Sequence, residues 1–441
     1  MDTERALVPA VRPALAAACP ALADGTADDA VAGVVPAFVA SPSSTQQASA
    51  LLRAAAEAGL AVVPRGAGTG LAWGGPPSRC DLVVDLRSMD QIVEHEAGDL
   101  VARVQAGATI GQLAVALGSA GQQLALDVPA EATVGGVVAT GTAGPRRFRY
   151  GAPRDLLIGI TVVRADGVVA HAGGKVVKNV AGYDLGKLFA GSYGTLGLIV
   201  EAAFRLHPLP AAATYTTADA AGPAEARRMV AAAAGSQLAP TAVEISRPGR
   251  DQPVHVGVLL EGDPAGVGER SAHLRELLGA GAVTSPDVPA WWGRTGPPDG
   301  QNGAGTLIRV GFWAAALPAV LAAIDAAAAT SGLDPLVAGS AAAGVIYVAL
   351  GAGAHPAAVA AFVAALREAI ARGAADARPA SAPVPDSPPV LASAVVVHAP
   401  PAVRELADMW GPVPGLPLMR AVKDQFDPGH RMAPGRFAGG I

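Results

Sequence analysis

Two kinds of apolar pattern alternate along the first half of the chain. Residues 44–59 and 109–120 repeat apolar side chains at helical spacing; the first stretch ends at Gly59, and Gly121 follows the second. Both are predicted helices, the first with Ser43, Ser44 or Thr45 as its N-cap. Short β-branched and Leu-rich runs between them predict strands. These runs lie at 60–63, 81–86, 100–104 and 196–206, with a hairpin of 158–163 and 168–171 about Asp166-Gly167.

The pattern changes after Pro210, where predicted strands alternate with longer Ala-rich helices. Strands are expected at 241–245, 254–261, 307–312, 345–350 and 394–398, and helices at 265–279, 317–331 and 356–373. This mixture predicts an α+β fold. We expect a first domain over 1–210, a second over 211–395, and a C-terminal segment, 396–441, that returns to the first domain. A loop at 285–304 and a linker at 375–390 interrupt the second domain.

Composition narrows the possible functions. A chain of 441 residues with 51% hydrophobic and 16% charged residues is expected to form two buried cores. The net charge of −5 gives no electrostatic basis for nucleic-acid binding. The apolar run from 310 to 324 is too short to span a bilayer. The chain start lacks a basic segment followed by an apolar one, so a cytoplasmic location is expected.

Cysteine and histidine usage argues against a metal centre. Two cysteines, Cys19 and Cys80, cannot supply the four thiolates of an iron–sulfur cluster. The eight histidines are scattered without the short spacings of zinc sites. We therefore expect no metal, and redox chemistry would depend on an organic cofactor with an external electron acceptor.

Three separated Gly-rich stretches are the main candidate site. The first is Pro64, Arg65, Gly66, Ala67, Gly68, Thr69 and Gly70; the second is Thr133, Val134, Gly135 and Gly136; the third runs from 191 to 197. Glycine lets the backbone turn through positive φ or approach a ligand closely. Consecutive N–H groups in such a loop can bind a pyrophosphate. The three stretches together predict a dinucleotide site.

A Rossmann site is the alternative interpretation of the first stretch, because a strand precedes Gly66 and Asp85 ends the next strand. That site needs a helix directly after the loop, with its N-terminus facing the pyrophosphate. Here two glycines and two prolines follow Trp73, and this sequence does not continue a helix. The pattern therefore favours a loop that binds phosphate through its own amides.

These stretches also carry a family resemblance. Together with 149–155 and 175–185, they resemble the PCMH-type FAD-binding domain of the vanillyl-alcohol oxidase superfamily. Within it the chain is most similar to the FAD-binding subunits of glycolate oxidases, over about 36–210. The resemblance implies two α/β subdomains that hold FAD and an α+β cap domain. It assigns residues 64–70 to the pyrophosphate, Thr133–Gly136 and Thr140 to the flavin and ribityl side, and Ile199 to the nucleotide end.

Departures from the family pattern refine this expectation. Relatives with covalent flavin often carry His at the position of Thr69, so noncovalent FAD is expected. The usual closing Asn-Pro-Gly reads Ala433-Pro434-Gly435, which removes an amide expected near the cofactor. The chain offers no clear catalytic base, and the weak candidates are Tyr183, His398 and Lys423.

The resemblance implies an FAD-binding oxidoreductase subunit that oxidises glycolate to glyoxylate. It also implies partners: a catalytic flavoprotein, an iron–sulfur subunit and, through them, peripheral membrane association. Two alternatives stay open. One is a self-sufficient FAD oxidase or dehydrogenase acting on another alcohol or hydroxy acid. The other is a flavin-free structural subunit that keeps the fold for assembly.

Overall fold

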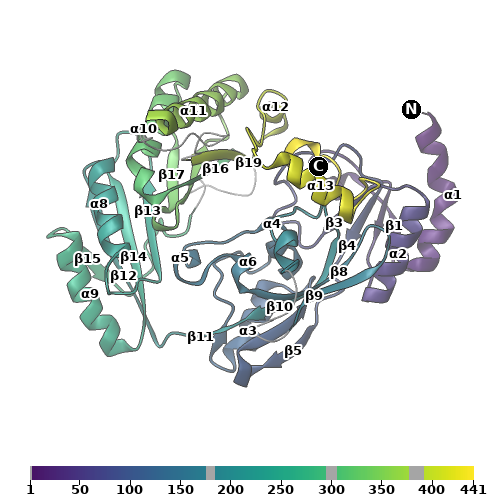
Figure 1. The fold of residues 1–441 in the computed structure, drawn as a ribbon, viewed down its shortest axis with the longest axis horizontal. Helices are drawn as coiled ribbons and strands as arrows, with labels where there is room; N and C mark the ends of the chain where they lie inside the picture. The colour runs from purple at the N-terminus through teal and green to yellow at the C-terminus, as the bar shows by residue number, and fades with distance from the viewer. Residues whose placement is uncertain (1, 175–183, 295–304, 377–391) are drawn as a thin grey trace. The chain divides into compact units, whose positions relative to one another are not determined.

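The computed structural model describes residues 2–174, 184–294, 305–376 and 392–441 (Figure 1). They form two compact units. Unit 1 comprises Met1–Ala143, Gly151–Leu209 and Pro412–Ile441, and unit 2 comprises Gly144–Tyr150 and Pro210–Gly411. The predicted α+β class is confirmed, since helices and strands mix in both units.

The predicted domain limits need two corrections. The chain returns to unit 1 at Pro412 and not at 396, because strand β19 (Ala392–His398) pairs along β16 (Thr306–Phe312) in the sheet of unit 2. Helix α5 (Arg147–Tyr150) belongs to unit 2, where it contacts β13 (Ala242–Arg247). Unit 1 is therefore built from three separate stretches of chain.

Unit 1 contains two sheets. The first has the order β1-β2-β4-β3, formed by Leu22–Asp24, Phe38–Ala40, Leu82–Asp85 and Val62–Arg65. Strands β2, β4 and β3 are parallel, and β1 is antiparallel to β2. Helices α1 (Asp2–Ala18) and α2 (Thr45–Glu57) pack against each other beside it. Of the three predicted caps for α2, Ser44 is the one whose side chain accepts a hydrogen bond, from the N–H of Gln47.

The second sheet of unit 1 is antiparallel, with the order β5-β6-β10-β8-β9. Its strands are Ile92–Glu96, Val101–Gln105, Leu198–Arg205, Leu157–Val163 and Val169–Gly173. Smaller elements complete the unit: β7 (Gln122–Gln123), β11 (His207–Pro208), α3 (Ile110–Gly118), α4 (Val134–Thr140), α6 (Pro153–Leu156), α7 (Gly186–Phe189) and α13 (Leu416–Phe426). One hydrophobic cluster contains buried side chains from both sheets, including Val84 and Val200.

Unit 2 is an eight-stranded sheet with the order β15-β12-β14-β13-β17-β18-β16-β19. The bounds of the remaining strands are β15 (Val283–Ser285), β12 (Ala212–Ala220), β14 (Val254–Gly262), β17 (Leu336–Ser340) and β18 (Val345–Leu350). Four long helices pack on one face: α8 (Pro223–Ala234), α9 (Pro264–Leu278), α10 (Leu317–Ser331) and α11 (Pro356–Asp376), with the short α12 (Pro401–Arg404) beside α11 (Figure 1).

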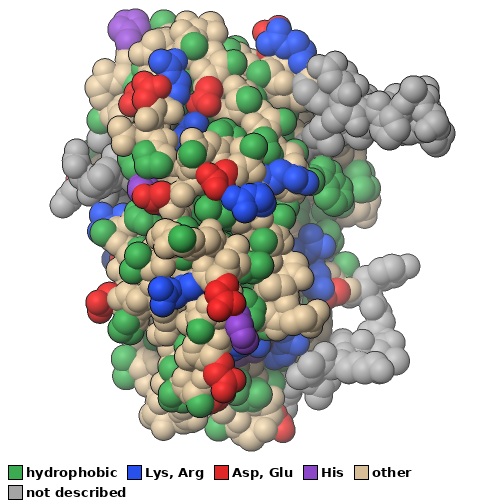
Figure 2. Space-filling model, turned by 90° about the vertical axis from the view of Figure 1, so that its left-hand side faces the viewer, with side chains coloured by type: hydrophobic (Ala, Val, Ile, Leu, Met, Phe, Trp, Pro, Cys, Tyr) green, Lys and Arg blue, Asp and Glu red, His purple; other side chains and the backbone are tan. Residues whose placement is uncertain are grey.

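Helix α10 explains the long apolar run noted in the sequence. Residues 314–331 are long and apolar enough to cross a membrane by length and composition alone. Its Leu317, Leu321 and Ile324 are fully buried in the core of unit 2. A buried core helix satisfies the same composition test. On the face drawn in Figure 2, acidic and basic side chains are interspersed and do not gather into one charged patch.

Candidate functional site

A pocket in unit 1 brings the three Gly-rich stretches together. It is lined by most of the residues predicted to bind FAD: Pro64, Arg65, Gly66, Gly68, Thr69, Gly70, Thr133, Gly135, Gly136, Thr140 and Ile199. Ala67 and Val134 are not among the lining residues; Ala67 is exposed and Val134 is buried in the core. The pocket also includes Tyr193, Gly194, Gly197 and, from the C-terminal segment, Arg436.

The first stretch begins as β3 ends at Arg65, and no helix follows within residues 66–81. This agrees with the argument against a Rossmann site. In the described part of the chain, the N–H groups of residues 67–70 donate no hydrogen bond to another protein group. Gly68 has a φ of +82° and nothing within 4 Å of the position of a Cβ. Four adjacent amides are thus available to an anion.

The second stretch is the first turn of a helix and not the loop that we expected. Thr133 precedes α4, and Gly135 and Gly136 lie within it. A Cβ on Gly135 would lie 2.7 Å from the Cβ of Ala106, and the Gly135 N–H donates to the Ala106 carbonyl at 2.8 Å. Glycine disfavours helices, but only glycine fits this contact with the chain after β6.

The first stretch interlocks with α4. A Cβ on Gly66 would lie 2.0 Å from the hydroxyl oxygen of Thr133, and one on Gly70 would lie 2.8 Å from Cγ2 of Thr140. No side chain larger than hydrogen fits at either glycine without a shift of this wall. The shape of the pocket therefore depends on both glycines.

The third stretch docks on the other end of α4. The Gly191 N–H donates to the Val138 carbonyl at 2.9 Å, and the Tyr193 N–H donates to the Ala139 carbonyl at 2.8 Å. Gly191 and Gly194 have φ values of +82° and +76°, a region that favours glycine. Helix α4 therefore holds two of the three stretches in place.

Arg65, the last residue of β3, makes two ion pairs. Its guanidinium lies 2.8 Å from Asp29 and 3.0 Å from Asp85. Arg87 also pairs with Asp85, at 2.7 Å. Burial alone would raise the pKa of Asp85, but the hydrogen bonds and charges of Arg87 and Arg65 outweigh it and lower that pKa. Asp85 thus anchors the base of the first loop.

Lys423, a weak catalytic candidate, lies in a buried structural network. Its ammonium donates to Asp427 and to the Thr195 carbonyl, both at 2.7 Å, and to the Met432 carbonyl at 2.9 Å. The side chain is 1% exposed, and it is not among the pocket-lining residues. Burial lowers the pKa of Lys423, an effect that Asp427 opposes. The geometry favours a structural link between α13 and the third stretch.

Of the other two catalytic candidates, the structure describes only His398, which is not among the pocket-lining residues. Tyr183 lies outside the described residues. His398 belongs to β19 of unit 2, where its Nδ1 is 3.0 Å from the Gly305 carbonyl. Burial lowers the pKa of His398, and the hydrogen bond to Gly305 opposes that shift. Among the described residues, the pocket lining includes no His, Asp, Glu or Lys.

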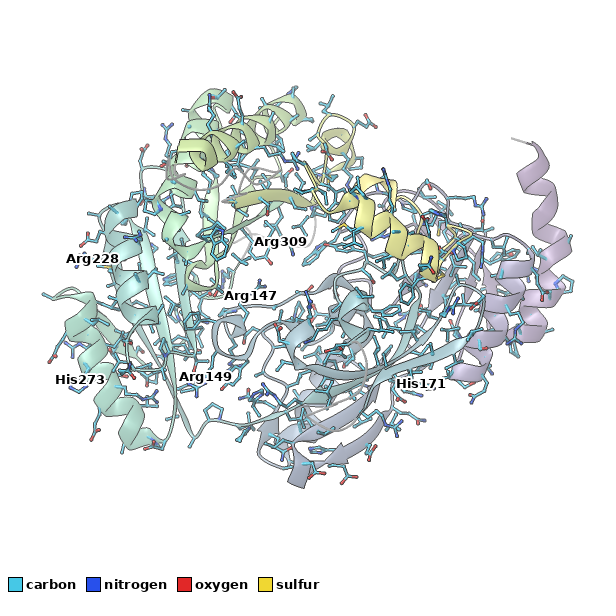
Figure 3. The ribbon with its side chains drawn as sticks, in the orientation of Figure 1. Arg147, Arg149, His171, Arg228, His273 and Arg309 are labelled. Atoms are coloured by element: carbon cyan, nitrogen blue, oxygen red, sulfur yellow. The ribbon has the colours of Figure 1, made fainter. Side chains whose placement is uncertain are left out.

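In unit 2, the sheet face opposite the helices carries polar and aromatic side chains. Trp291 stacks near His255, and both Trp rings lie over Gly257, where a Cβ would be within 3 Å of each ring. Three arginines lie close together in the sequence here: Arg146 pairs with Glu261 at 2.9 Å, and Arg147 and Arg149 lie on α5 (Figure 3).

Arg309 is a further cation on this face. Its neighbours Ile308 and Val310 are buried against the helices, so Arg309 (Figure 3) points to the opposite face. It pairs in register with Tyr347 of β18. Among the described residues it makes no ion pair. No sequence pattern singles out Arg309, because one Arg in a strand is common.

The donor set of the unit 1 pocket suits a dinucleotide. Open loop amides and the guanidinium of Arg436 can bind a diphosphate, while Leu71, Leu86 and Ala139 supply an apolar wall for a ring system. Because Gly66, Gly70 and Gly135 have no side chains, their backbone atoms can line the cavity. In the described parts of the chain, no three His, Cys, Asp or Glu residues are grouped to hold a metal ion.

Comparison with known proteins identifies this region. Residues 36–173 match the family described as FAD binding domain, so this part of the chain is similar to the members of that family. Three relatives match in sequence. Glycolate oxidase subunit GlcD of Bacillus subtilis is 39% identical over 178 residues, covering 40% of this chain. D-lactate dehydrogenase of Archaeoglobus fulgidus is 39% identical over 171 residues, covering 38% of this chain. Glycolate oxidase subunit GlcE of Escherichia coli is 42% identical over 132 residues, covering 29% of this chain.

The chain matches 38% of the length of each of these three relatives. Among solved structures, p-cresol methylhydroxylase with bound substrate aligns with a TM-score of 0.71 at 16% identity, covering 98% of this chain and 96% of that one. A carbohydrate oxidase from Microdochium nivale gives 0.67 at 17% identity, covering 96% and 97%. The expected resemblance to PCMH-type FAD-binding proteins is confirmed, and these structures show that the fold is shared.

Proposed function

We propose that this chain is an FAD-dependent oxidoreductase subunit that oxidises a small 2-hydroxy acid, with glycolate to glyoxylate as the reference reaction. The observation that carries the proposal is the pocket in which open amides at 67–70 meet α4 and the third stretch. Relatives named for glycolate, D-lactate and D-2-hydroxyglutarate match the chain over 171–178 residues and support the class of substrate.

Several residues of this chain would hold the cofactor. The loop amides of 67–70 would bind its diphosphate, Thr133 and Thr140 would face the flavin side, and Ile199 would meet the nucleotide end. Thr69 offers no imidazole for a covalent bond, so the cofactor would be held noncovalently. When bound, FAD would accept the hydride that leaves the α-carbon of the hydroxy acid.

The substrate carboxylate needs a cation, since a guanidinium or an ammonium pairs well with a carboxylate. The hydroxyl proton needs a base, and among the described residues the pocket lining offers no His, Asp, Glu or Lys. This favours a subunit working within a hetero-oligomer over a self-sufficient enzyme. With only Cys19 and Cys80, both buried, the chain would pass electrons to partners: a catalytic flavoprotein and an iron–sulfur subunit, which could also bring it to a membrane.

A flavin-free structural subunit is the competing function, and Ala433 in place of the family Asn is the observation that favours it. Ala433 has a φ of +42°, a backbone conformation that Asn tolerates better than Ala. The change thus removes the side-chain amide of the family pattern and places Ala in a backbone conformation that suits Asn better.

The test is to purify the chain alone, measure bound flavin, and add glycolate without oxygen. Bleaching of the flavin absorbance would mean a complete active site in this chain and would contradict the partner requirement. A flavin that stays oxidised with the chain alone, but is reduced when the partner subunits are present, supports the proposal. A chain that takes up no FAD would favour the structural subunit.

A substitution pair tests the diphosphate assignment. Gly68→Asp places a carboxylate in the open space beside the loop amides, and Gly68→Asn is the neutral control with the same backbone demand at φ +82°. We expect the Asp variant to lose its flavin while the Asn variant keeps most of it. Equal retention by both variants would refute the assignment of an anion to this loop.

A further inference from the structure

The C-terminal segment, Arg431–Phe437, is built into the pocket of unit 1. The Val62 N–H donates to the Arg431 carbonyl at 2.8 Å, and the Ala433 N–H donates to the Val62 carbonyl at 2.7 Å. These bonds align the segment parallel to β3, the strand that leads into the first Gly-rich stretch. The segment therefore continues the sheet at its β3 edge.

Beyond Ala433 the segment crosses the chain that follows the first stretch. The Ser78 N–H donates to the Pro434 carbonyl at 2.8 Å, and the Gly75 N–H donates to the Arg436 carbonyl at 3.1 Å. A Cβ on Gly74 would lie 2.7 Å from the Arg436 carbonyl oxygen. The two backbones are thus in direct contact, which only glycine at position 74 permits.

The Arg436 side chain contacts the backbone that follows the first stretch. Its Nη2 donates to the carbonyls of Leu71 and Trp73, both at 2.8 Å. The residue is 3% exposed, and it lines the pocket. One guanidinium therefore fixes two carbonyls at the point where the loop leaves the pocket.

Arg436 also matters for the charge of the pocket. Arg65 and Arg436 are the two charged residues in its lining. The charge of Arg65 is offset by Asp29 and Asp85, within 3.0 Å. Arg436 and the loop amides would therefore both contribute to the positive field that a diphosphate meets.

We propose that Arg436 is a positioning residue for the cofactor, which fixes the backbone of 71–75 so that the amides of 67–70 face the diphosphate. The inference rests on the proposed FAD function and deepens it. It assigns cofactor affinity to a side chain from the C-terminal segment, outside the matched family region of 36–173. Arg436 acts through the loop, and no role in the chemical step is implied.

The experiment compares three variants of the full chain as apoprotein. Arg436→Met removes the donors and the charge but keeps the volume, and Arg436→Lys keeps the charge and one donor group. Arg431→Met is the matched control, because Arg431 also ties the segment to backbone carbonyls, those of Ala165 and Leu60, but does not line the pocket. FAD affinity is measured by fluorescence titration, and the stability of each apoprotein by thermal unfolding.

We expect Arg436→Met to weaken FAD binding at least tenfold and Arg436→Lys to recover part of that loss. Arg431→Met should lower the apoprotein Tm while leaving the FAD Kd within about twofold of wild type. Wild-type affinity in Arg436→Met, or equal weakening by Arg431→Met, would overturn the positioning role. If Arg436→Met does not fold, unchanged affinity in Arg436→Lys overturns it, and a weakened one supports it. A wild-type apoprotein that binds no FAD would instead refute the proposed function.

Discussion

The buried ammonium of Lys423 offers a direct test of whether this residue is structural. Lys423→Met replaces it with an apolar side chain of similar length. The change leaves three acceptors without this donor: Asp427 and the carbonyls of Thr195 and Met432. Asp427 has no exposed surface and keeps the N–H of Met432 as a donor, at 2.7 Å.

The size of the effect follows from burial. Removing one partner of a buried ion pair costs about 3–5 kcal/mol, because the remaining charge is desolvated and uncompensated. We expect Lys423→Met to lower the free energy of unfolding of unit 1 by about 4 kcal/mol. The double variant Lys423→Met/Asp427→Asn removes the stranded carboxylate and should recover roughly half of that loss.

Urea unfolding measures both variants. With an m-value of about 3 kcal/mol/M, the single variant should shift the midpoint of the unit 1 transition by roughly 1 M. A shift below about 0.3 M would refute the reasoning, because the ammonium would then contribute little. If stability were unchanged and turnover were lost, Lys423 would return as a catalytic candidate. A double variant as unstable as the sum of its single variants would show that the two groups are not coupled.

Two further predictions concern the pocket. Asp85→Asn should lower the free energy of unfolding by about 3 kcal/mol near neutral pH. Folding lowers the pKa of Asp85, so the extra stability of wild type over Asp85→Asn should be complete above the ordinary pKa of 3.8 and shrink as pH falls through the lower folded pKa. Urea midpoints of both proteins measured from pH 6 to 3 check this. A difference in midpoint that grows as pH falls would contradict it. Acid precipitation of the flavin-loaded chain should release the flavin into the supernatant, since Thr69 cannot form the histidyl bond; flavin that stays in the pellet would show covalent attachment.

Local chemistry explains which elements could be predicted from the sequence. Helix α3 follows from Thr109, which forms a capping box with Gln112, and the β8–β9 hairpin follows from the Asp166-Gly167 turn. Strands β12 and β17 were missed because Ala, Thr and Gly fill them in place of large β-branched residues. Their strand character comes from pairing with β14 and β18, which the sequence does not display.

The pocket could be predicted only in part, for a related reason. Gly66, Gly68 and Gly70 stand out because three glycines in five residues are unusual beside a strand. The sequence favours a loop at Gly135 and Gly136, because glycine is a poor helix former. The reason for glycine in this helix is a tertiary contact with Ala106, which no local pattern shows. Arg436 was missed because 365 residues separate it from Leu71, and no local pattern links the two.

That separation has a consequence for how the protein is made. The segment that completes the first loop is synthesised only after the 202 residues from Pro210 to Gly411. At about 5–20 residues per second, this delay is roughly 10–40 s. The main stretch of unit 2 is continuous and can fold during that interval. Strand β3 lacks its pairing with the C-terminal segment until that segment has been synthesised. Flavin capture would therefore be a late event, completed after the ribosome has passed residue 437, and a nascent chain stalled before Arg431 would stay colourless.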